Sequence, residues 1–202
     1  MKMPWRQWSW PDRAAVGLIA LAFVAVLAVG LISRGPMIGD EVTHYYLLMT
    51  QAKQFPVPTV IAEIPLAGGR SETRGYPHVF LWHYAGAALV KLTGGGLALV
   101  QVYQALFWLQ FLVVAWLFAR REPGMDEWTA LVTLAVLASM PMCLLLAVAF
   151  YQDIPAAAQI LTSFFFLRRR QMWLSVLFMC LGLSIKETSF VVLPLYAVCM
   201  VL

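Results

Sequence analysis

The stretch AAVGLIALAFVAVLAVGLIS, residues 14–33, followed closely by GDEVTHYY, residues 39–46, decides the fold class and the placement of every other motif. The first stretch has 20 residues without a charge. That is roughly 30 Å of helix, enough to cross a bilayer. The second stretch places two adjacent carboxylates, Asp40 and Glu41, directly after this span. Carboxylates at a membrane boundary are costly unless they are solvated or used, so this boundary is a candidate functional site.

Residues 40–54 follow with helical spacing, and we predict a helix that lies along the membrane surface. Asp40 and His44 stand four residues apart and so share one face of this helix, as do Glu41 and Tyr45. Two interpretations of the carboxylates stay open at this point. They either carry chemistry at the membrane boundary or only stabilise the helix N-terminus through the helix dipole.

The composition indicates a polytopic membrane protein. Hydrophobic residues make up 62% of the 202-residue chain, and charged residues only 12%. A soluble domain carries about 25% charged residues. The net charge of +4 does not indicate a nucleic-acid partner, because the basic residues gather at the ends of apolar runs, where they set membrane orientation. The cysteines lie inside apolar runs and are interpreted as small buried hydrophobic residues; they are Cys143, Cys180 and Cys199.

The placement of the arginines decides the topology. Basic residues and tryptophans in residues 1–13 predict a cytoplasmic N-terminus, so the first span emerges on the outer face. Residues 78–92 form an apolar segment of only 15 residues, short for a span. If this segment spans, Arg120, Arg121 and residues 168–170 fall outside; if it lies on the outer surface, all of them fall inside. The positive-inside rule therefore favours a surface helix.

We predict an all-α polytopic membrane protein with about six transmembrane helices and two surface helices, the latter in an outer loop formed by residues 34–96. Residues 1–202 form a single module, and residues 68–75 are expected to be flexible. The predicted spans are residues 14–33, 97–119, 128–150, 154–167, 172–185 and the run from 189 onward. Pro141 predicts a kink in the third. The last run is still apolar at Leu202, so we expect the chain to be the N-terminal part of a longer protein.

Candidate functional residues gather on the predicted outer face, at the ends of spans. Three separate connections supply them: Asp40, Glu41, His44, Asp153, Lys186 and Glu187. The later three also have structural interpretations. Asp153 and Glu187 each precede a helix that they could cap, and Lys186 could simply extend toward the interface. The histidines at 44, 78 and 83 are interpreted as solvated interfacial residues or as ligands.

The order of these motifs resembles that of the GT-C glycosyltransferases, membrane-embedded enzymes that use polyprenyl-phosphate-linked sugars. The matching pieces are Gly39-Asp40-Glu41, Tyr76-Pro77-His78, Asp153-Ile154-Pro155 before Arg168, and Lys186-Glu187-Thr188 before Pro194. The Asp-Glu-x-x-His form, with Tyr151-x-Asp153, is most similar to the alpha-1,2-glucosyltransferase branch of dolichol-linked oligosaccharide assembly. The protein mannosyltransferase and aminoarabinose transferase branch has similar acidic motifs. Two departures are the Tyr76-Pro77 pair, where the family usually has Pro-Pro, and the shorter chain.

The resemblance implies hexosyl or pentosyl transfer, with inversion, from a polyprenyl-phosphate donor to a hydroxyl of a glycan, lipid or protein acceptor. The reaction is expected at the outer face of the cell or inner membrane. Asp40 is implied as general base, with Glu41 and Asp153 orienting the acceptor. Asp40 and Asp153 are also the candidate ligands of a divalent metal. The expected substrate-binding residues, with cations for the donor phosphate among them, are His44, Arg70, Arg74, His78, Lys186 and Glu187.

Two other function classes stay open. A transporter or lipid flippase would place ionisable or helix-breaking residues at mid-span, where they line a path. The mid-span regions of this chain hold Gln101, Gln104, Gln110, Pro141 and Gln159. A structural membrane subunit would not need acidic residues gathered on one face. The charge placement therefore favours an enzyme that acts at the outer surface.

Overall fold

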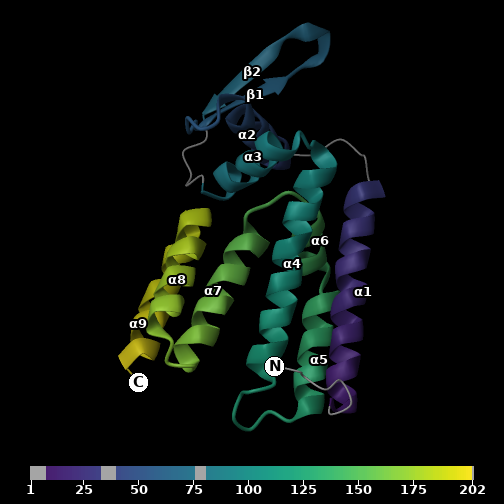
Figure 1. Cartoon of the computed structure of the whole chain (residues 1–202), viewed down its shortest axis with the longest axis vertical. Coiled ribbons are helices and arrows are strands. Elements are labelled where there is room, and N and C mark those ends of the chain that lie inside the picture. The colour runs from purple at the N-terminus through teal and green to yellow at the C-terminus, as the bar shows by residue number, and fades with distance from the viewer. Residues whose placement is uncertain (1–7, 33–39, 76–80, 202) are drawn as a thin grey trace.

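The computed structural model of the chain is an elongated bundle of helices with a small β-hairpin at one end (Figure 1). It describes residues 8–32, 40–75 and 81–201, and the side chains of residues 40, 67, 187 and 201 lie outside this description. The α-helices are α1 (Trp10–Ile32), α2 (Asp40–Gln54), α3 (Leu81–Thr93), α4 (Leu97–Ala119), α5 (Glu127–Ser139), α6 (Pro141–Val148), α7 (Asp153–Arg168), α8 (Met172–Ile185) and α9 (Leu193–Val201). The other elements are β1 (Ile61–Pro65), β2 (Ser71–Gly75) and the short 3-10 turns η2 (Ala67–Gly69) and η3 (Glu187–Val192).

Two helices, α1 and α4, are long and apolar enough to cross a membrane, with 23 residues each. The bent pair α5 and α6 supplies a third span if it is counted as one. These helices lie side by side (Figure 1) around a core that includes Ile19, Trp108, Leu112 and Leu134. The prediction of apolar helices suited to a membrane is confirmed for these segments. With 16 and 14 residues, α7 and α8 are shorter than the roughly 20 that a bilayer requires.

A sharp bend of 56° separates α5 from α6, immediately before Pro141. Proline has no N–H to donate, and its ring clashes with a carbonyl of the preceding turn, so the predicted kink is confirmed. Gln104 of α4 donates through Nε2 to three carbonyls near the end of α6. These belong to Leu146, Ala149 and Tyr151, at 3.1, 3.3 and 3.0 Å. The end of α6 is therefore fixed to α4 by hydrogen bonds.

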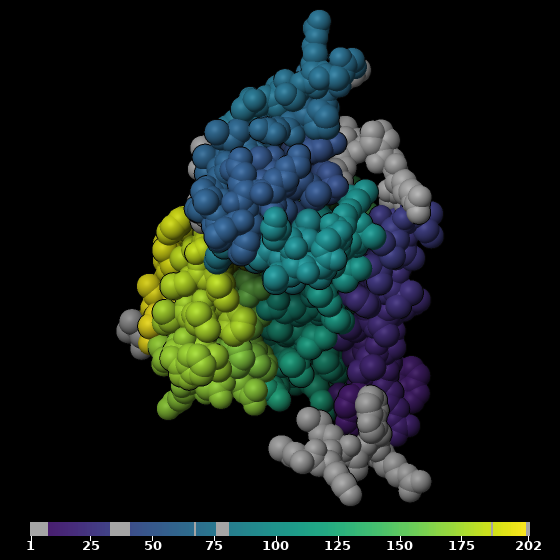
Figure 2. Space-filling model, turned by 45° about the horizontal axis from the view of Figure 1, so that its top comes forward, coloured from purple at the N-terminus to yellow at the C-terminus, as the bar shows by residue number. Residues whose placement is uncertain are grey.

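The helices α2 and α3, together with the hairpin, form a layer over one end of the bundle, between α1 and α8 (Figures 1 and 2). We call these elements the α2–α3 layer. Its core joins Leu48 of α2 and Trp82 of α3 to Phe150, which precedes α7. Gly86 lets the two helices approach closely, because a Cβ on it would lie 2.5 Å from the Leu48 Cδ1 atom. The layer is thus packed on the connection that leads into α7.

The hairpin is stabilised from one side. Ala62 and Ile64, alternate residues of β1, are buried against Leu47 of α2. The turn uses Gly68 and Gly69, whose φ values of 79° and 75° lie in the left-handed region that glycine adopts at little cost. No residue of β2 is buried, and its sequence shows no alternation of apolar residues. This strand therefore depends on pairing with β1 to form.

Two predictions are corrected by this hairpin. Ile61 pairs with Gly75, and Pro65 pairs with Ser71, in an antiparallel ladder. The segment 68–75 therefore forms a turn and a strand, not a flexible loop, and the fold is mostly rather than entirely helical. The reason is tertiary: the strand forms because β1 is held on α2, which the polar sequence of residues 71–75 does not reveal.

Buried serines join α7 to α8. The Oγ of Ser163 donates to the carbonyl of Ser175 at 2.7 Å, and the Oγ of Ser175 donates to the carbonyl of Ser163 at 2.9 Å. The Oη of Tyr196 on α9 lies 2.6 Å from the Ser175 Oγ. Small residues let the backbones of α7 and α8 approach each other, and their hydroxyls bond across the interface.

A Schellman turn ends α7. The N–H of Gln171 donates to the carbonyl of Phe166 at 3.0 Å, and the N–H of Arg170 donates to that of Leu167 at 2.9 Å. Arg170 has a φ of 56°, at the position where glycine is the usual residue. A residue with a Cβ atom loses about 1 kcal/mol in this left-handed conformation. The chain therefore keeps an arginine where a glycine would be less strained.

Candidate functional site

Glu41, in the first turn of α2, is bonded to a distant part of the chain. Its Oε1 accepts the backbone N–H of Phe150 at 2.9 Å, across 109 residues of sequence. Phe150 is fully buried, and its ring lies 4.3 Å from that of Trp82 between centroids. The acidic motif after α1 is therefore fixed to the connection that leads into α7, and the predicted role of Glu41 toward an acceptor stays a prediction.

Two buried histidines, His44 on α2 and His83 on α3, meet between these helices. The Nδ1 of His44 is 2.9 Å from the Nε2 of His83, and the two rings stack with centroids 5.1 Å apart. The Nδ1 of His83 is 3.4 Å from the Nε2 of Gln152. In a neutral pair of this kind one imidazole donates a proton and the other accepts it. A chain of polar side chains thus runs from α2 through α3 to the residue before α7.

Lys186, which follows α8, forms an ion pair through Nζ with the Oδ1 of Asp153, the first residue of α7. Both side chains are partly exposed, at 28% and 37%. The N-cap position of α7 belongs to Gln152, without a capping bond from its side chain. The alternative that Asp153 caps this helix is therefore not observed, and Lys186 contacts a carboxylate instead of simply extending to an interface.

These contacts converge on one end of the bundle, because α3 touches both α2 and the end of α8. The ring of Tyr151 adds an edge contact to His44, with centroids 5.9 Å apart. Glu41, His44, Asp153 and Lys186 thus share one end of the molecule. Whether that end faces the outside of a membrane stays a prediction.

Arg70 and Arg74 are not brought to this site. Arg74 donates through Nε to the Oε1 of Glu72 at 2.8 Å, within β2. That bond lowers the pKa of the Glu72 carboxyl below its usual range. Arg70 follows the hairpin turn and is exposed. The hairpin lies beyond α2 and away from α7 and α8 (Figure 1), so Lys186 is the cation beside Asp153.

Three predicted site residues lie outside the described side chains. Asp40 opens α2, one residue before Glu41, and Glu187 opens η3, but only their backbones are described. His78 lies outside the described residues altogether. Their roles stay predictions.

A metal centre gains no support from the residues in view. Among the side chains that the structure describes, which exclude those of Asp40 and Glu187, no three His, Cys, Asp or Glu lie close enough to hold a metal ion. Asp153, a candidate ligand, is already paired with the ammonium of Lys186, a partner that disfavours a further cation there. The divalent metal therefore stays a prediction that depends on Asp40.

His83 is the main residue that the sequence reasoning missed. The sequence predicts a solvated interfacial residue or a ligand at this position, whereas His83 is fully buried and central to the histidine pair. The buried residues of α3 are Trp82, His83, Gly86, Ala87 and Val90. Their spacing is that of one apolar helix face, so His83 could have been placed inward from its period alone.

Two further donors lie near this pair. The Nε1 of Trp82 is buried and has no hydrogen-bond partner among the described residues. Its ring lies edge-on to His44, with centroids 6.0 Å apart. Burial, with Tyr46 beside it, raises the pKa of the Tyr45 phenol, so that hydroxyl stays protonated at neutral pH. Buried donors usually find acceptors, so the Trp82 N–H is an exception among the groups around this pair.

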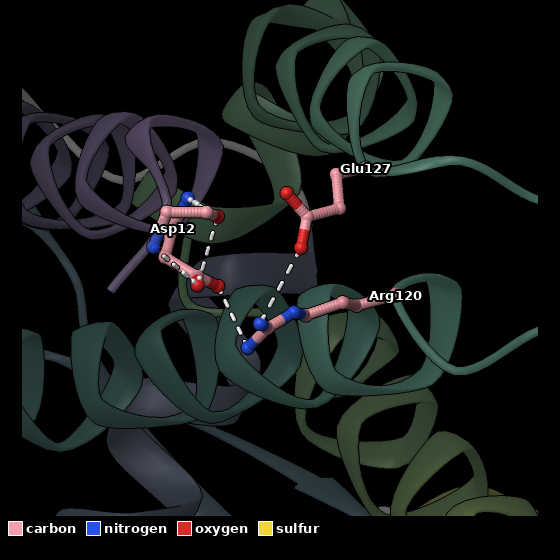
Figure 3. Close-up of polar contacts among 4 residues, drawn as sticks. Asp12, Arg120 and Glu127 are labelled. Atoms are coloured by element: carbon pink, nitrogen blue, oxygen red, sulfur yellow. Dashed lines mark hydrogen bonds and ion pairs between the residues drawn. The ribbon is translucent and has the colours of Figure 1, made fainter. Parts of the chain in front are cut away.

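The opposite end of the bundle carries the arginines. Arg120, after α4, contacts Asp12 of α1 at 2.7 Å and Glu127 of α5 at 3.6 Å (Figure 3). Arg168, at the end of α7, pairs with Glu122. The largest cavity described, about 590 Å³, also lies at this end. The cavity and the contacts that join α2, α3, α7 and α8 therefore lie at different ends of the molecule.

Comparison of the chain with protein-family models, with curated protein sequences and with solved structures finds no match. Function has therefore to be inferred from this chain's own residues. What they offer is a partly exposed ammonium and carboxylate, a buried histidine pair and an acidic helix start, all at one end of apolar helices.

Proposed function

We propose that this protein is a multi-pass membrane glycosyltransferase of the GT-C type, which moves a sugar from a polyprenyl-phosphate donor to a hydroxyl acceptor. In this proposal α1, α4, the pair α5–α6, α7, α8 and α9 cross the membrane. The N-terminus is cytoplasmic, and α2 and α3 lie at the outer surface. The ion pairs of Arg120 and Arg168, at the end opposite the α2–α3 layer, support this orientation through the positive-inside rule.

The observation that carries the proposal is the Asp153–Lys186 pair at the same end as the Glu41–Phe150 bond. A lipid-phosphate donor keeps its tail in the bilayer and its phosphate at the surface, so the enzyme must present its charged groups at that boundary. The leaving phosphate develops negative charge, which a cation stabilises. Lys186 is partly exposed and can exchange Asp153 for the donor phosphate.

The acceptor hydroxyl is a weak nucleophile and needs a carboxylate base. Asp40 has this role in the proposal, because the bond between Glu41 and Phe150 fixes the helix turn that carries it. The His44–His83 pair holds α2 against α3 and so supports the same turn. Asp153, released from Lys186 when the donor binds, orients the acceptor.

Transport is the second candidate, and the break between α5 and α6 favours it, because broken helices line the paths of many transporters. Against it, the carbonyls near the end of α6 bond to Gln104. The cavity between α1 and α6, about 340 Å³, is lined by Ala25, Val26, Val29, Leu144, Leu145 and Val148. It holds no ionisable group for a polar substrate.

The test offers radiolabelled polyprenyl-phosphate sugar to membranes that carry the protein at full length, as wild type or as Asp40→Asn. Loss of a general base lowers a rate by about 10² to 10⁴. We therefore expect transfer to fall by that factor while donor binding survives. The matched control is Asp126→Asn at the opposite end, which keeps its N-cap because asparagine caps as well as aspartate.

Each other outcome is informative. Equal transfer by wild type and Asp40→Asn removes Asp40 from the mechanism. Parallel loss of donor binding and transfer assigns Asp40 a metal-holding or structural role. If intact donor moves across the membrane without transfer of its sugar, the protein is a transporter and not a glycosyltransferase.

A further inference from the structure

Two adjoining cavities lie between the ends of the helices at the arginine end. The larger, about 590 Å³, is lined by Phe118, Leu167, Arg168, Arg170 and Cys199 among others. The smaller, about 310 Å³, includes Phe118, Arg121, Phe165, Arg168 and Arg169 in its lining. Because they share Phe118 and Arg168, we treat them as one surface, the arginine groove. It combines aromatic and aliphatic walls with four guanidinium groups.

The positive charge of this groove is poorly balanced. Arg168 pairs with Glu122, but none of the carboxylates in the described part of the chain pairs with Arg121, Arg169 or Arg170. The guanidinium carbons of Arg121 and Arg169 lie 5.6 and 5.2 Å from the centroid of the same ring, Phe165. Two cations at one ring concentrate positive charge there, and a bound anion would offset it. Guanidinium groups bind phosphate oxygens in paired hydrogen bonds.

Arg170 is the second, independent sign of a ligand. It occupies the left-handed position of the Schellman turn, with a φ of 56°, where glycine is the usual residue. The Schellman turn requires this conformation of whichever residue stands here, and a glycine would adopt it at less cost. Membrane orientation needs only positive charge near a helix end, which Arg168 and Arg169 already supply. An arginine at this strained position, lining the larger cavity, indicates a use for its side chain.

We propose that the arginine groove binds an anionic phospholipid, a function beyond the proposed sugar transfer. Its phosphate is drawn to the guanidinium groups of the two adjoining cavities, Arg121 and Arg169 in one and Arg170 in the other, and one acyl chain follows Phe118 and Leu167. The proposed orientation places this end in the cytoplasmic leaflet, where anionic lipids gather and where basic pockets between helices bind their headgroups. A lipid matches both halves of the groove, because a free phosphate ion would leave the apolar wall unused.

The test uses protection of a cysteine in the purified full chain in detergent. Cys199 lines the groove and is exposed, whereas Cys180 is exposed on α8 and lines neither cavity. Alkylation by N-ethylmaleimide is followed at both cysteines by peptide mass spectrometry, with dioctanoyl phosphatidylglycerol added at increasing concentration. We expect the anionic lipid to slow alkylation of Cys199 and leave Cys180 unchanged. Dioctanoyl phosphatidylcholine should protect neither.

Arg170→Gly is the decisive variant, because glycine adopts the left-handed turn without strain and the turn is therefore kept. Loss of a charge-assisted hydrogen bond weakens lipid binding, so the lipid concentration that gives half-maximal protection of Cys199 should rise by about tenfold. Arg13→Gln removes one positive charge from α1, at the same end but outside the groove. It should change the half-protecting lipid concentration by less than about twofold. Arg169→Gln should act like Arg170→Gly, and circular dichroism checks that each variant is folded.

Three outcomes would overturn the proposal. One is equal protection in wild type and Arg170→Gly. Another is equal protection by the zwitterionic lipid, which would make the groove an unselective apolar surface. The third is equal protection by glycerol phosphate, which has no acyl chain and would make it a free-anion site.

Discussion

The two ends of the helical bundle handle polar groups in opposite ways. At the end covered by the α2–α3 layer, apart from the partly exposed Asp153–Lys186 pair, they are wholly or partly buried and join distant segments: Glu41 reaches Phe150 across 109 residues, and His44 reaches His83 across 39. At the arginine end, ion pairs join helix ends at the surface. The side chains of Arg168 and Glu122 are 46% and 35% exposed, and Asp12 is the buried exception.

This difference shows that the number of charges does not locate a site. A surface ion pair contributes about 0–1 kcal/mol, and most of those at the arginine end are of this kind. A buried polar group left without a partner costs about 1–3 kcal/mol, so each buried bond at the other end constrains which segments can meet. That constraint holds Glu41, His83 and Gln152 around the start of α7.

The largest expected difference between the two ends of the bundle is in the rate of sugar transfer. Lys186→Gln removes the cation proposed for the donor phosphate, and loss of one such electrostatic contact costs about 10² to 10³ in rate. The matched variant at the arginine end is Glu127→Gln, which removes a carboxylate 3.6 Å from Arg120. Transfer by Glu127→Gln should stay within about twofold of wild type, because an exposed pair contributes little. Sugar transfer in membranes measures both, and equal losses would mean that the two ends act as one unit.

Substitution of two glycines by alanine should change the free energy of unfolding in opposite directions, because the two sites are packed differently. A Cβ on Gly86 would meet the buried Leu48 at 2.5 Å, whereas Gly17 on α1 has no heavy atom within 4 Å of that position. Gly86→Ala should lower the free energy of unfolding by about 3 kcal/mol, the upper range for overpacking. Gly17→Ala should raise it by about 0.5–1 kcal/mol through helix propensity. Unfolding in mixed micelles with increasing SDS tests both, and a tolerated Gly86→Ala would show that α2 and α3 can separate.

Asp12 sharpens the comparison at the arginine end, because its side chain is only 6% exposed. Arg120→Gln leaves this carboxylate with the Ser9 contacts at 3.2 and 3.0 Å. The free energy of unfolding should fall by about 2 kcal/mol, less than the 3–5 of a fully buried pair, since Arg120 is 39% exposed. The control is Arg13→Gln, on the helix that carries Asp12. Its free energy of unfolding should match that of the wild type.

The smallest effect concerns pH. The backbone N–H of Thr129 donates to Asp126 at 2.6 Å and lowers the pKa of that carboxyl below its ordinary value of 3.8. A lowered pKa in the folded state means that the stabilisation is complete above that ordinary value and is lost as pH falls through the folded pKa. As pH falls from neutral to below 3.8 and through the lowered folded pKa, wild type should therefore lose slightly more stability than Asp126→Asn. Thermal unfolding compares them, and identical pH profiles would exclude this contribution.

The sequence by itself determined the local elements. The predicted segments 40–54, 97–119 and 172–185 have the same bounds as α2, α4 and α8. The bend before Pro141 follows from the chemistry of proline. These features depend on apolar runs, helical spacing and backbone chemistry within a few residues. The sequence also placed Asp153 and Lys186 at span ends, which the structure brings into contact.

Only the tertiary structure decided which of these residues meet. The bond between Glu41 and Phe150, the pair of His44 with His83, and the strand at residues 71–75 all depend on partners elsewhere in the chain. A buried hydrogen bond forms where packing brings a donor and an acceptor within about 3 Å, and no local pattern encodes that distance. The site at the start of α7 is therefore a property of the packed α2–α3 layer, not of any single motif.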